Sequence, residues 1–174
     1  MNLTERTLSA YQRTLPVEPA DAHCDVPCGL YDPHAAQIAA LTVVRMVQLT
    51  QDLAKPDANA SKEQIDSYVN SLTRYVTTKE EHATIVKKEI SIIWSDYFTP
   101  EHVQKFPELH DLVWKTMKHA SKAKQEINME ASQSVVSGVQ RIAEIFWETK
   151  GAKTKRQPSL QRSGGELVYP VPAA

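Results

Sequence analysis

Apolar residues between positions 34 and 149 recur at steps of three and four, which is the spacing of a helix face packed against other helices. The first helix is expected to begin at Asp32-Pro33, because proline suits the first turn, where an amide would stay unpaired, and to end near Lys55. A second begins at the capping-box residues Ser61 and Gln64 and continues towards Phe98, with the polar stretch 77–81 as a candidate position for a bend.

Two further helices follow, one starting near Pro107 and one spanning about 132–149. Alternating strand patterns are not evident, and the connections between the helices are short. The pattern therefore predicts an all-α protein, an antiparallel four-helix bundle whose paired apolar faces supply most of the stability.

Both ends of the chain differ from this middle part. Residues 1–22 lack the apolar stretch of about 7–15 residues that a secretory signal needs, and they end in small and acidic residues. We expect 1–22 to be a cleavable pro-segment that a processing protease removes, and the product to be cytoplasmic. Residues 151–174 are basic and rich in proline and glycine, which predicts a disordered tail.

Composition removes several functions from consideration. The net charge of −1 and the single short basic tail do not favour nucleic-acid binding. Apolar runs stay well short of the roughly 20 residues that cross a bilayer, so no membrane partner is expected. The five glycines form no phosphate-binding loop.

The chemistry is concentrated in residues 23–31, which read His-Cys-Asp-Val-Pro-Cys-Gly-Leu-Tyr and contain the only two cysteines. A disulfide is disfavoured in a cytoplasmic compartment, a thioredoxin-like pair uses a different spacing, and a structural zinc site wants four side-chain ligands. Square-planar nitrogen and sulfur coordination, in contrast, is typical of Ni(II) or Cu(II). Cleavage after Ala22 would convert the His23 amide into a free amine, which adds a ligand to the two thiolates. The loop therefore predicts small-molecule redox chemistry at an exposed metal-binding hook.

This motif, extended to Asp32-Pro33, resembles the signature of nickel-containing superoxide dismutases. The resemblance continues through 94–98, 100–102, 106–110 and 145–150, so that it covers essentially all of residues 23–150. It implies a bundle over 23–150 with the hook at 23–31, and a homo-oligomer, expected to be a hexamer. The implied reaction converts superoxide to dioxygen and hydrogen peroxide with one nickel ion per subunit.

The resemblance also implies a role for each hook residue. His23 would bind nickel through its amine and imidazole, Cys24 through its backbone nitrogen and thiolate, and Cys28 through its thiolate. Tyr31 would guard the open face of the metal. Asp25 and Pro27 would not bind the metal but would hold the hook in shape.

One difference from the better-known branch of the family concerns support of the axial imidazole. A Glu–Arg pair provides it there, whereas Ala39 and His82 occupy those positions here. Because such partners orient and tune metal ligands, we expect the redox properties to differ. Two other interpretations stay open at this point: a non-catalytic nickel or copper carrier or sensor, and a helical interaction module with an incidental cysteine pair.

Overall fold

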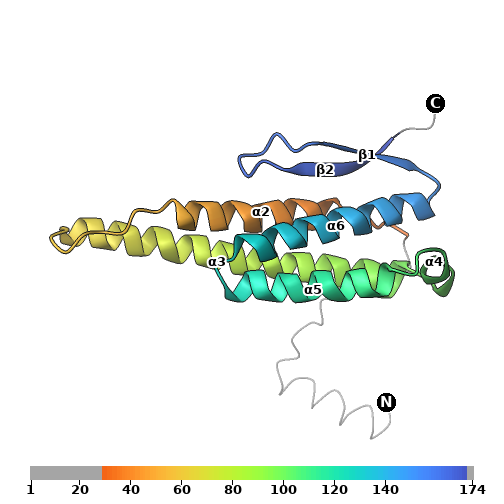
Figure 1. Cartoon of the computed structure of the whole chain (residues 1–174), viewed down its shortest axis with the longest axis horizontal. Helices are drawn as coiled ribbons and strands as arrows, with labels where there is room; N and C mark the ends of the chain where they lie inside the picture. The colour runs from red at the N-terminus through yellow and green to blue at the C-terminus, as the bar shows by residue number, and fades with distance from the viewer. Residues whose placement is uncertain (1–28, 172–174) are drawn as a thin grey trace, which may run out of the picture.

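The computed structural model describes residues 29–171, and it is mostly helical, as the sequence predicts. Helices α2, α3, α5 and α6 are long and lie side by side (Figure 1). The elements are α2 His34–Gln51, α3 Lys62–Ile92, the π-helix η1 Ile93–Tyr97, α4 Pro100–Lys105, α5 Leu109–Gln125, α6 Met129–Thr149, β1 Lys153–Pro158 and β2 Glu166–Val171. Helix α2 packs on α3 and α6, and α5 packs on the same two helices.

The helix ends follow from local hydrogen bonds. The capping box at α3 is present: the Gln64 amide donates to Ser61 Oγ and the Ser61 amide donates to Gln64 Oε1. Helix α2 begins at His34 with Pro33 in the N-cap position, one residue later than predicted, and Asp32 Oδ1 accepts from the amide of His34. Helix α6 begins at Met129 rather than near 132, because Asn128 caps it by accepting from the Ala131 amide. Helix α2 ends at Gln51, earlier than expected, and α3 continues through 77–81 without interruption.

The core is formed by aliphatic residues of the four long helices. The largest fully buried side chains are Phe146, Ile90, Leu109, Ile142 and Ile145. Helices α5 and α6 approach closely at Gly138, where a Cβ would lie 2.2 Å from Thr116 Oγ1. A larger residue at position 138 would require the Thr116 side chain or the helices to shift.

The C-terminal segment is not a disordered tail over residues 153–171, and the expectation of an all-helical chain is wrong there. Strands β1 and β2 pair antiparallel and lie along α2 and α6 (Figure 1). The side-chain amide of Gln37 donates to Val168 O (3.1 Å) and accepts from Val168 N (2.7 Å), as a neighbouring strand would. Leu167 and Val168 are buried, so the hairpin adds to the core despite its basic composition.

The charged residues of β1 explain why the sequence of the hairpin does not show a recognisable strand pattern. Most of β1 is exposed, and Arg156 pairs with Glu144 of α6 at 2.7 Å. Only two residues of β2 are buried, too few to give a clear alternating pattern. None of the helices in the described part of the chain is both long and apolar enough to cross a membrane.

Two leucines of the hairpin provide a matched test of this packing. Leu167 is 2% exposed and Leu160, at the turn, is 94% exposed. We expect Leu167→Ala to lower the free energy of unfolding by about 2–4 kcal/mol, since it leaves a cavity under the hairpin, and Leu160→Ala to change it by less than about 0.5 kcal/mol. Urea unfolding followed by circular dichroism measures both; equal effects would mean that the hairpin does not pack on the helices.

Candidate metal centre and its approach

Only the last part of the predicted hook, residues 29–31, belongs to the described residues. His23, Cys24, Asp25, Pro27 and Cys28 lie outside them, whereas Tyr31 lies inside, on the segment that leads into α2. Between Cys28 and Tyr31 stands Gly29 with φ +69°, a left-handed conformation that residues with a side chain rarely adopt. The chain therefore leaves the predicted metal loop through a turn that favours glycine.

Tyr31 lies against an aromatic residue at the far end of the second long helix. Its ring centroid is 5.6 Å from that of Tyr97, with the ring planes tilted by 55°. Tyr97 is the last residue of η1, where the Phe98 amide donates to Ile93 O across five residues at 3.0 Å. This wider turn changes the direction of the side chains that follow, and π-turns of this kind recur at functional sites.

Side chains from two other elements fix the ring of Tyr97. His102 of α4 stacks on it with centroids 5.6 Å apart, and Phe146 of α6 lies 4.5 Å away. The Tyr97 hydroxyl lies 2.7 Å from Thr149 Oγ1, which itself donates to Phe146 O at 2.6 Å. Because a threonine hydroxyl has one proton, Tyr97 is the donor to Thr149, and its oxygen keeps free capacity to accept.

A cation completes this cluster. Lys150 Nζ lies 5.1 Å from the ring centroids of both Tyr97 and Phe146. Within residues 29–171 no carboxylate pairs with Lys150, so its charge is not neutralised by an ion pair there. A positive charge beside Tyr97, whose ring contacts Tyr31, would favour the approach of a small anion.

Sequence reasoning assigned no role to Tyr97, Thr149 or Lys150, although all three lie in segments that carry the family resemblance. Their proximity depends on the π-turn and on the packing of the end of α6 against η1, which no local pattern reveals. Tyr31, in contrast, was named from the sequence, and the structure places it in this aromatic cluster.

The two residues that replace the Glu–Arg pair do not supply a comparable charge pair. Ala39 is buried in α2, and its methyl group offers no hydrogen bond. His82 is half-buried, and its Nδ1 lies 3.0 Å from Thr78 O in the preceding turn. Since a carbonyl can only accept, the Nδ1 of His82 carries a proton and donates to Thr78 O.

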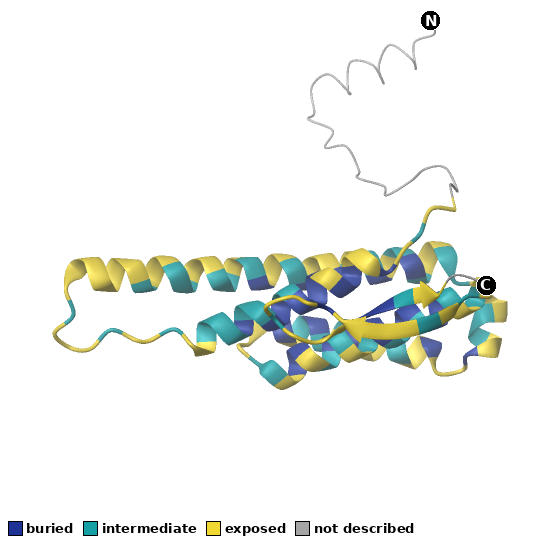
Figure 2. Cartoon of the chain, turned by 90° about the horizontal axis from the view of Figure 1, so that it is seen from above, coloured by how far each residue is buried: buried dark blue, intermediate teal, exposed yellow. Residues whose placement is uncertain are grey.

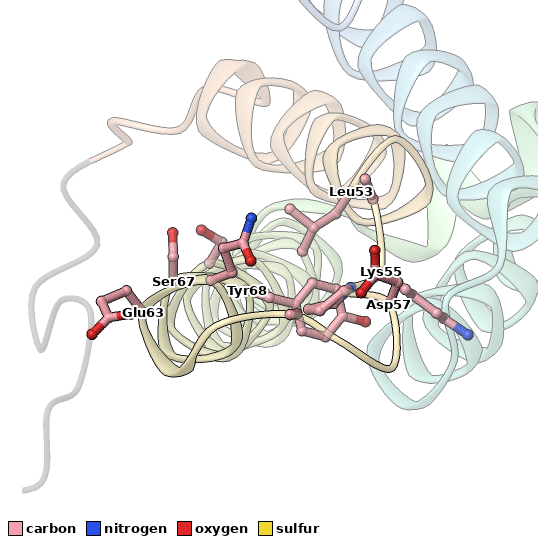
Figure 3. Close-up of a pocket in the computed structure, with 11 residues that line it drawn as sticks. Leu53, Lys55, Asp57, Glu63, Ser67 and Tyr68 are labelled. Carbon is pink, nitrogen blue, oxygen red and sulfur yellow. The ribbon is translucent and has the colours of Figure 1, made fainter.

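Other parts of the described chain do not offer a competing metal site. Residues 29–171 contain no group of three histidine, cysteine or acidic side chains close enough to bind an ion. A hollow of about 550 Å³ lies at the opposite end of α3, between that helix and the 52–61 connection (Figure 3). Its lining includes Leu53, Asp57 and Tyr68 and has no cluster of metal ligands.

Comparison with known proteins decides the family. A family model described as nickel-containing superoxide dismutase matches residues 18–150. The chain belongs to the nickel-containing superoxide dismutase family. It is 41% identical to a nickel superoxide dismutase of Streptomyces coelicolor, over 131 residues that cover 75% of this chain and 90% of the relative. The corresponding enzyme of Streptomyces seoulensis is 37% identical over the same shares.

Solved structures agree with this assignment. A native nickel superoxide dismutase structure matches with a TM-score of 0.63 and 38% identity, and the match covers 74% of this chain and 99% of that one. The chain is thus an enzyme that disproportionates superoxide with a nickel cofactor. The β1–β2 hairpin lies beyond the residues that the family model matches.

Lys150 gives a testable consequence for this nickel superoxide dismutase. Lys150→Gln should lower the second-order rate constant with superoxide several-fold at low ionic strength, because it removes a positive charge beside Tyr97, the ring that contacts Tyr31. The loss should shrink at about 0.5 M salt, where charges are screened within a few ångströms. Lys55→Gln, in the 52–61 connection at the opposite end of α3, is the control and should behave as the wild type (Figure 3). Pulse-radiolysis rates across a salt series measure both; a salt-independent loss in Lys150→Gln would contradict steering.

Proposed function

We propose that the mature enzyme begins at His23 and that His23, Cys24 and Cys28 hold one nickel ion per subunit. The donor set fits: two thiols, an imidazole and a new terminal amine within six residues match the soft sulfur and nitrogen ligands that nickel accepts. The contact of Tyr31 with Tyr97 carries the proposal, because it ties the chain three residues after Cys28 to a built cluster on the helices.

When bound, nickel supplies one-electron exchange with superoxide. The balance is two superoxide anions and two protons giving one dioxygen and one hydrogen peroxide. One anion gives up an electron, and the other gains an electron and the two protons.

The residues of the chain bind and orient the substrate in this scheme. Tyr31 and Tyr97 narrow the approach and offer phenol groups for hydrogen bonding, and Lys150 attracts the anion. Asp25 and Pro27 would help hold the hook in shape, and the proline ring restricts φ at its position.

We further propose that the four long helices form an antiparallel four-helix bundle over 23–150, and that mature cytoplasmic subunits assemble into a homo-hexamer. The up-and-down packing of α2, α3, α5 and α6 and the family membership support the bundle. Closed symmetric assemblies are the usual state of such soluble oligomers.

The decisive experiment compares two forms of the protein. Chain trimmed to begin at His23 should bind about one nickel per subunit and be active, since the free amine of His23 completes the ligand set. The full-length chain should bind nickel weakly, because an amide nitrogen is a poor donor until it is deprotonated. Metal analysis and a superoxide assay, with the N-termini verified by mass, measure this.

Controls separate the outcomes. Cys24→Ser and Cys28→Ser should each abolish nickel retention and activity and leave helical content intact. Nickel bound without turnover in the trimmed chain would indicate a carrier or sensor. An intact precursor as active as the trimmed form would refute the amine-ligand mechanism.

A further inference from the structure

The buried face of α3 stops part-way along the helix. Its buried residues are Lys79, Ala83, Val86 and Ile90, which follow one another at steps of four, three and four. This is the spacing of the a and d positions of a coiled-coil heptad. Over this half of α3 the stripe faces the rest of the bundle.

The same spacing continues towards the N-terminus of α3 for two more heptads. Its members are all apolar: Ile65, Val69, Leu72 and Val76, here called the tip stripe. Ile65 is 45% exposed and Val69 is 52% exposed, and the other two are half-buried. Figure 2 shows that the part of α3 that projects from the bundle is mostly exposed or intermediate. An apolar seam in register with the core is thus left without a covering helix in the described part of the chain.

Lys79 marks the place where the covering ends. Its Nζ donates to Ala123 O (2.6 Å), Lys124 O (2.6 Å) and Glu126 O (2.9 Å), and so caps the C-terminus of α5. Residues of α3 before Lys79 project past this end of the bundle (Figure 1). The 52–61 connection covers the flank that carries Tyr68, and none of the tip-stripe residues lines the hollow beneath it (Figure 3).

We propose that the tip stripe is a two-fold contact in which α3 of a second copy of this chain packs antiparallel against it. Val69 and Val76 occupy a positions, and Ile65 and Leu72 occupy d positions. Apolar residues at successive a and d positions form the seam through which one helix of a coiled coil packs against another. A copy of the same helix is therefore a partner whose side chains fit this seam.

Charges beside the stripe favour the antiparallel orientation. Lys62 and Glu80 both lie on the flank opposite Tyr68, at the two ends of the stripe, and both are exposed, although Lys62 also pairs with Asp66 of its own helix. Antiparallel pairing centred near residue 71 brings Lys62 of each copy to Glu80 of the other. Parallel pairing would instead place like charges together at each end.

This contact names a surface for the self-association proposed above, and it does not depend on nickel. Failure of the metal chemistry shows in the superoxide assay, whereas failure of this contact shows in the mass of the assembly.

The test uses the full chain and two matched variants. Ile65→Glu/Val69→Glu places charges in the seam, and Asn70→Glu places one on an exposed neighbouring face of the same helix. If a two-fold contact is lost, the assembly should separate into units of half the wild-type mass. Sedimentation equilibrium at micromolar concentration should show this halving for the double variant and wild-type mass for Asn70→Glu.

A charge exchange tests the orientation. Lys62→Glu and Glu80→Lys should each weaken association several-fold, and the combined variant should regain it, because opposite charges face each other again. Circular dichroism should show unchanged helical content in every variant. Wild-type mass in Ile65→Glu/Val69→Glu, or a monomeric wild type, would overturn the proposal; no recovery in the combined variant would overturn the antiparallel pairing.

Discussion

The contact between Tyr31 and Tyr97 joins the two halves of this enzyme. One half is a short loop whose donors can bind a metal, and the other is a helical scaffold with no metal ligands of its own in the described residues. Tyr97 is itself fixed by His102, Phe146 and Thr149, which belong to α4 and α6. Tyr31, in the described part of the predicted hook, thus contacts a ring cluster in which three helices meet.

The sequence predicts the helical part of this arrangement well. Periodic apolar residues located all four long helices, and the capping box at Ser61 set the start of α3. The observed helix ends differ from the predicted ones where a single capping side chain sets the end, as Asn128 does at the start of α6. The metal donors follow from residue type and spacing, yet their geometry lies outside the described residues and stays a prediction.

The features that the sequence did not predict all depend on distant partners. The hairpin forms because Gln37 and Gln140 of the helices bind its backbone and because Leu167 and Val168 find a surface to bury against. The position of Tyr97 depends on the π-turn. Lys150 is singled out only because the fold places its ammonium group over the rings of Tyr97 and Phe146. Neither the hairpin nor the cluster of Tyr97 and Lys150 is marked by a local sequence pattern, because the contacts that form them join residues far apart in the chain.

X-ray absorption at the nickel edge of protein that begins at His23 tests the central claim most directly, because it counts sulfur donors. The account predicts two sulfur ligands per nickel with nitrogen completing the set, and no bound nickel in Cys28→Ser. A spectrum with only oxygen and nitrogen ligands, in protein shown to be active, would contradict it.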